Sequence, residues 1–102
     1  MNDRTLLELA ARAAGIDPVL AEPINFSTGV EYYWNPRDDD GDALRLAVKL
    51  NFTVSICDEF TKVTHGFEEG IIEYADGHKE FATRMAITRA AAEIGKSMGG
   101  GE

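Results

Sequence analysis

The stretch KEFATRMAITRAAAEIGKS, residues 79–97, predicts a helix because its apolar residues recur at helical spacing. The main apolar stripe consists of Ile87, Ala90, Ala91, Ile94 and Met98, flanked by Ala82, Met85 and Ala86. Because alanine side chains are small, this helix is expected to lie close against a sheet or another helix.

The middle of the chain alternates between apolar and polar residues, which is typical of strands with one buried face. In the segment FTVSIC, the side chains of Phe52, Val54 and Ile56 are expected on one side. Two further strands are predicted around residues 61–65 and 70–74, separated by the turn-like segment GFEEG. Three successive strands joined by short turns predict an antiparallel meander.

The beginning of the chain predicts another helix, over residues 3–14, ended by Gly15. A proline-containing loop and a short strand at residues 30–34 are expected to follow. A three-stranded sheet cannot cover its own apolar face and needs a helix laid across it. The predicted fold class is therefore α+β, a three-layer helix/sheet/helix sandwich around a short antiparallel meander. One domain is expected over residues 1–98, with a flexible glycine-rich tail at 99–102.

The stretch YYWNPRDDDGDALRLAVKL, residues 32–50, predicts a helix that begins near Gly41. Its apolar face is expected to carry Leu44, Ala47 and Val48, with Leu46 and Leu50 beside it and Asn51 as the stop. Asp39 or Asp40 is expected to cap the helix, and the Asn35–Pro36 pair to set the turn into it.

The acidic run of Asp38, Asp39, Asp40 and Asp42 has three interpretations: a calcium loop, an acidic binding surface, or a helix start. In an EF-hand loop with Gly41 at the sixth position, Pro36 is first and Ala47 twelfth, and neither has a side-chain oxygen ligand. This is therefore not an EF-hand, and no metal site is predicted. The helix cap explains the run best.

The aromatic residues before the turn also have two interpretations. Trp34 is expected to fill the core beside the start of the helix, as a large indole before a tight turn usually does. The alternative is an exposed recognition patch formed by Tyr32, Tyr33 and Trp34.

The composition of the 102 residues limits the function classes. A formal net charge of −8 disfavours direct binding to nucleic acid and fits either a basic partner or solubility alone. Cys57 is the single cysteine, consistent with a reducing cytoplasm. No signal peptide and no membrane-spanning segment is predicted.

The residues able to perform chemistry form no recognisable catalytic pattern. His65 and His78 are expected to be exposed near turns, outside any short metal or nucleophile spacing. The segment GKSMGGG follows a helix and lacks the upstream glycine of a phosphate-binding loop, so an ATPase is not expected. No cofactor is predicted. Arg84 and Arg89 are each suited to hold a phosphate or carboxylate, or to lie along the helix edge.

A family resemblance is carried by YWNPRDDDGDALRLAVKL, by the later FATRMAITRAAAEIGKSM, and by the opening LLELAARAAG. Together these segments resemble the phage ABA-sandwich domain proteins and, more distantly, the NinX-like proteins of lambdoid phages. The resemblance implies a helix-sheet-helix sandwich and a phage or prophage origin, and it brings no catalytic residues. The segment EPINFSTGVE, residues 22–31, is longer than the family pattern.

Two functions follow as hypotheses. The first is a non-enzymatic phage accessory protein that binds a host or phage protein with a basic surface, with inhibition as one mode of action. The alternative is a small-molecule or nucleotide-sequestering protein that stacks a base on the aromatic cluster and holds phosphate with arginine. The candidate binding residues are Tyr32, Tyr33, Trp34, Asp38, Asp40, Arg84 and Arg89.

Overall fold

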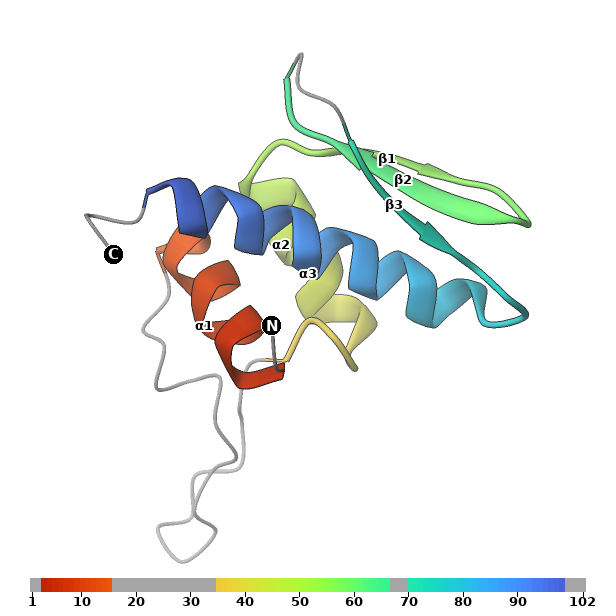
Figure 1. Ribbon diagram of the computed structural model, residues 1–102, viewed down its shortest axis with the longest axis horizontal. Coiled ribbons are helices and arrows are strands. Elements are labelled where there is room, and N and C mark those ends of the chain that lie inside the picture. The colour runs from red at the N-terminus through yellow and green to blue at the C-terminus, as the bar shows by residue number, and fades with distance from the viewer. Residues whose placement is uncertain (1–2, 16–34, 67–69, 99–102) are drawn as a thin grey trace, which may run out of the picture.

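The computed structural model describes residues 3–15, 35–66 and 70–98 (Figure 1). The elements in chain order are α1 (Asp3–Ala14), α2 (Asp40–Lys49), β1 (Thr53–Ile56), β2 (Phe60–Thr64), β3 (Ile71–Tyr74) and α3 (Lys79–Ser97). The predicted α+β class is confirmed, as are the three helices. The expected strand at 30–34, the segment 22–31, the aromatic cluster with Trp34 and the tail at 99–102 lie outside the described residues.

The three strands form the predicted antiparallel meander, in the order β1-β2-β3. The register places Val54 opposite Val63, and Val63 opposite Ile71. These side chains share one face of the sheet and belong to the buried core or pack against it. On the same face, the hydroxyl oxygens of Thr61 and Thr83 lie 2.9 Å apart and join β2 to α3.

The helices lie on one side of the sheet. Helix α3 packs against β2 and β3, and it also contacts α2 and α1. Figure 1 shows the sheet on one side of α3 and α1 on the other. The layers therefore run from the sheet through α3 to α1, and α1 completes the core by packing on a helix. The opposite sheet face carries Lys62, Ile72 and Tyr74, all exposed.

Small residues allow α1 and α3 to cross at close range. A Cβ atom built at Gly95 of α3 would overlap the carbonyl group of Leu9 in α1. Alanines around this contact are fully or almost fully buried: Ala10, Ala11, Ala14, Ala91 and Ala92. The expected close packing of the alanine-rich helix is confirmed, and its nearest neighbour is the backbone of α1.

Two of the predicted apolar faces need correction. In α2 the buried residues include Ala43, Leu46 and Ala47, whereas Leu44 is 63% and Val48 68% exposed. The helix has apolar residues on two adjacent faces, and the sequence pattern selected the wrong one. Met98, predicted on the stripe of α3, lies just past the helix end and is 53% exposed.

We predict that Gly95→Ala lowers the free energy of unfolding by about 1–3 kcal/mol, because the added methyl group forces the two helix backbones apart. The same change in an exposed helix interior stabilises by about 1 kcal/mol, so the sign of the effect is diagnostic. Urea denaturation measures it. Lys96→Ala, at the next and exposed position, is the control and should change stability by less than about 0.5 kcal/mol. A Gly95→Ala variant as stable as wild type would contradict the close crossing.

Candidate functional site

The start of α2 is fixed by two carboxylates with different roles. Asp39 is the N-cap, and its side chain accepts a hydrogen bond of 2.7 Å from the backbone N–H of Asp42. Asp42 is buried and accepts bonds from the backbone N–H of Asn35 at 2.9 Å and from Arg45 at 2.7 Å. The predicted cap is therefore confirmed with Asp39 in that position, and Asp42 ties the preceding turn to the helix.

The Asn35–Pro36 turn is closed by hydrogen bonds of its own. The carbonyl oxygen of Asn35 accepts from the N–H groups of Asp38 at 3.1 Å and Asp39 at 3.0 Å. Its side-chain oxygen accepts from the N–H of Arg37 at 3.1 Å. Across the described residues, His, Cys, Asp and Glu side chains form no group of three suited to a metal ion. Asp39 and Asp42 in particular accept backbone hydrogen bonds that define the helix start.

Arg84 joins this turn to α3. Its Nε donates to the carbonyl oxygen of Arg37 at 2.9 Å, and a terminal nitrogen lies 2.6 Å from a carboxylate oxygen of Asp40. The guanidinium groups of Arg84 and Arg37 lie 5.9 and 5.7 Å from the centre of the Phe81 ring, within cation–π range. The Arg84 side chain is only 18% exposed. Arg84 therefore holds α3 to the turn at Arg37 and to the first residue of α2.

The other candidate residues are only partly brought together. Asp40 and Arg84 form a pair, and Asp38 lies nearby, accepting from the side chain of Asn35 at 2.9 Å. Arg89 forms an ion pair with Glu73 of β3. The two arginines thus engage carboxylates on different neighbouring elements.

An apolar groove of about 450 Å³ lies between α2, β1 and α3. We call it the α2–β1–α3 groove. Its apolar lining consists of Ala43, Leu44, Val54, Ile56 and Ile87. Leu44 is 63% and Ile56 55% exposed, so two large apolar side chains face solvent there. Sequence reasoning missed this site, although the second apolar face of the helix at residues 40–49 was a visible signal.

Charged residues form the rim of the groove. Asp40, Lys79, Glu80 and Arg84 line it. Both cations engage carboxylates: Arg84 pairs with Asp40, and Lys79 lies 3.0 Å from Asp58 in the β1–β2 turn. Next to these four residues lie the acids Asp38, Asp39, Asp42 and Asp58 and the cations Arg37 and Arg45, so the rim and its neighbours together carry six carboxylates and four cations. The rim is therefore acidic on balance.

This local charge matters because the described residues as a whole are almost balanced. They contain all ten Lys and Arg residues of the chain but only twelve of its eighteen Asp and Glu residues. The net charge of −8 is therefore not spread evenly over the described fold. Attraction of a basic partner to the described residues depends on the acidic rim rather than on the total charge.

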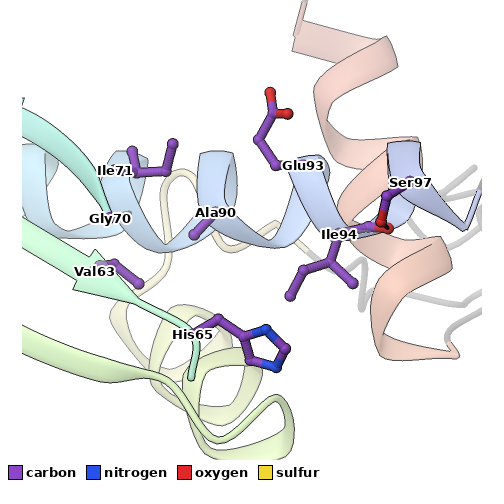
Figure 2. A pocket seen from close by; sticks show the side chains of 8 residues that line it. All are labelled: Val63, His65, Gly70, Ile71, Ala90, Glu93, Ile94 and Ser97. Carbon is purple, nitrogen blue, oxygen red and sulfur yellow. Dashed lines mark hydrogen bonds between the residues drawn. The ribbon is translucent and has the colours of Figure 1, made fainter. Parts of the chain in front are cut away.

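A second hollow, of about 500 Å³, lies between the sheet and the end of α3. Its lining includes Val63, His65, Glu93, Ile94 and Ser97. Figure 2 shows the Glu93 carboxylate pointing away from the His65 imidazole, and the Ser97 hydroxyl donates to the carbonyl of Ile94 at 2.9 Å. These groups are not arranged for joint acid–base chemistry. His65 and His78 are both exposed, as predicted.

Comparison with protein-family models, with curated proteins and with solved structures finds no match. The resemblance to the phage ABA-sandwich proteins therefore stays a prediction. No helix among the described residues is long and apolar enough to cross a membrane.

We predict that the three acids of the helix start differ in importance for stability. Asp42→Ala leaves the buried N–H of Asn35 without its acceptor and should cost about 1–3 kcal/mol. Asp39→Ala removes the cap and should cost about 1 kcal/mol. Asp40→Ala, the control, breaks the ion pair of an aspartate that is 76% exposed and leaves the bond from Arg84 to the Arg37 carbonyl in place, so it should cost less than about 1 kcal/mol. Chemical denaturation of the three variants ranks them. A ranking led by Asp40 would contradict these hydrogen bonds.

We also predict that Asp58→Asn lowers the pKa of Lys79. In the native protein a hydrogen bond from Lys79 to Asp58, and the charge of that carboxylate, raise the pKa of Lys79 above its ordinary value of 10.5. A raised lysine pKa means that the contact stabilises the fold below about pH 10.5 and that this stabilisation is lost as the pH rises through the folded-state pKa. An NMR titration of the Lys79 Nζ measures the shift. Glu80→Gln, which removes a weaker influence, should lower the pKa less.

Proposed function

We propose that this chain is a non-enzymatic bacteriophage or prophage accessory protein that acts in the host cytoplasm by binding a host or phage protein. The observation that carries this proposal is the α2–β1–α3 groove, with its apolar lining and acidic rim. The family resemblance supports the phage origin. The single cysteine fits a reducing compartment.

The groove combines apolar surface that a partner can bury with charge that a partner can complement. Covering the exposed parts of Leu44 and Ile56, 63% and 55% of these residues, with apolar groups contributes about 1–2 kcal/mol for each side chain. The acidic rim favours partners with Lys or Arg around an apolar centre and speeds their encounter at low salt. The partner is therefore expected to present apolar residues bordered by basic ones.

The nucleotide-binding alternative has less support. Arg84 already binds Asp40 and the carbonyl of Arg37, and Arg89 binds Glu73, so phosphate binding by either arginine requires an existing contact to break. The proposed stacking residues lie outside the described part of the chain. A flat thermal-shift response across a panel of nucleotides would remove this alternative.

Affinity capture from a bacterial lysate tests the proposed function. Wild type and Leu44→Asp serve as baits, and Val48→Asp is the matched control because Val48 lies on the same helix, is 68% exposed and does not line the groove. We expect a partner that is retained by wild type and by Val48→Asp, lost with Leu44→Asp, and released at about 0.5 M salt. Both variants should match wild type in stability within about 0.5 kcal/mol. The proposal would be refuted if Leu44→Asp retained the same partners as wild type. It would also be refuted if every captured partner were acidic.

A further inference from the structure

Strand β1 has an open edge. Within the described residues it pairs with β2 on one side only. The N–H of Cys57 donates to the carbonyl of Phe60 at 2.9 Å, so these two residues form a hydrogen-bonded pair at the turn. In an antiparallel ladder such pairs alternate. The register then directs the backbone groups of Ser55 towards β2, and those of Val54 and Ile56 away from it.

The open edge is continuous with the groove. Val54 and Ile56, whose backbone N–H and C=O groups point outward, are also the two β1 residues whose side chains line the α2–β1–α3 groove. At the start of the edge, the N–H of Phe52 donates to the carbonyl of Ala47 at 3.0 Å, which closes that end against α2. The available edge is therefore short and lies directly beside an apolar hollow.

The other edge of the sheet is protected and this one is not. Strand β3 carries Glu73 on its helix-facing side, where it pairs with Arg89 of α3. An inward-pointing charge of this kind discourages the addition of another strand. Strand β1, which consists of Thr53, Val54, Ser55 and Ile56, has neither a charge nor a proline. Of the two edges formed by the described strands, that of β1 is therefore the one suited to strand addition.

We propose that the partner binds with an extended segment that adds as a fourth strand beside β1. This rests on the proposed function and specifies its mode. The backbone of the segment bonds to Val54 and Ile56, and its alternate apolar side chains enter the groove against Leu44 and Ile87. Lys or Arg residues flanking the apolar ones face the acidic rim around Asp40 and Glu80.

Charge favours a foreign segment over a second copy of the chain. Pairing β1 with β1 of another copy brings together two edges of net negative charge, because Asp40, Asp58 and Glu80 outnumber Lys79 and Arg84 along this edge in both copies. Like charges across an interface oppose association. A basic segment meets the rim with opposite charge.

Selection from a displayed library of random peptides about twelve residues long tests this binding mode. Wild type is the bait, and Leu44→Asp removes peptides that do not use the groove. We expect a consensus with apolar residues at alternate positions and Lys or Arg at the flanks. Apolar residues at helical spacing would overturn strand addition while leaving groove binding, and so the proposed function, intact. A selection in which no peptide distinguishes the two baits would overturn both.

Two measurements on the best synthetic peptide locate the added strand. Amide exchange at Val54 and Ile56 should slow by about tenfold or more, whereas the amides of Ile72 and Tyr74, on the outer edge of β3, should not change. N-methylation of the peptide backbone should weaken binding about tenfold at alternate positions only, because one edge of the added strand faces β1. Unchanged exchange at Val54 and Ile56 would overturn the proposal. The proposal would also be overturned if wild type without peptide sedimented as a dimer and the amides of Val54 and Ile56 were protected in that dimer.

Discussion

The contact between Gly95 and the backbone of Leu9 determines how the helices are layered. With no side chain at Gly95, the backbones of α1 and α3 approach so closely that a methyl group does not fit between them. The surrounding alanines are buried on both helices, so one side of α3 is covered by α1 while the other side packs on β2 and β3. Because α1 packs on α3, none of the described helices covers the other face of the sheet. The sheet accordingly keeps an exposed face with Lys62 and Tyr74.

Burial of Asp42 is the second constraint, and it determines which face of α2 turns outward. Because its carboxylate accepts the N–H of Asn35 in the interior, the side of α2 that carries Asp42, Ala43 and Leu46 must face the core. The adjacent face with Leu44 is then exposed beside β1. The groove is apolar because burial of Asp42 orients α2 so that its second apolar face, with Leu44, lies beside β1.

The sequence was sufficient for the parts of the fold that depend on local pattern and not for those that depend on orientation. The helices at residues 3–14 and 79–97 and the order of the strands followed from periodicity and from glycine at a helix end. The face of α2 did not, because Leu44, Ala47 and Val48 have the same spacing as Ala43, Leu46, Ala47 and Leu50. Burial of Asp42 could not be predicted either, because an aspartate is normally exposed. It is buried here because Asn35 and Arg45, seven and three residues away, donate hydrogen bonds to its carboxylate. The groove depends on elements whose relative placement no local pattern specifies.

The negative charge of the acidic run at the start of α2 both stabilises the helix and makes the rim of the groove acidic. Negative charge at a helix N-terminus stabilises the helix by meeting unpaired N–H groups and the positive end of the dipole, as Asp39 does. Asp39 and Asp42 accept backbone hydrogen bonds, while Asp38, Asp39 and Asp40 are exposed and Asp40 lines the groove. Because the N-cap and the first turn of α2 are acidic and the exposed Leu44 follows directly in the same helix, acidic and apolar surfaces adjoin here. A basic, apolar segment is the chemistry complementary to that combination, and the unprotected edge of β1 gives it a backbone to pair with.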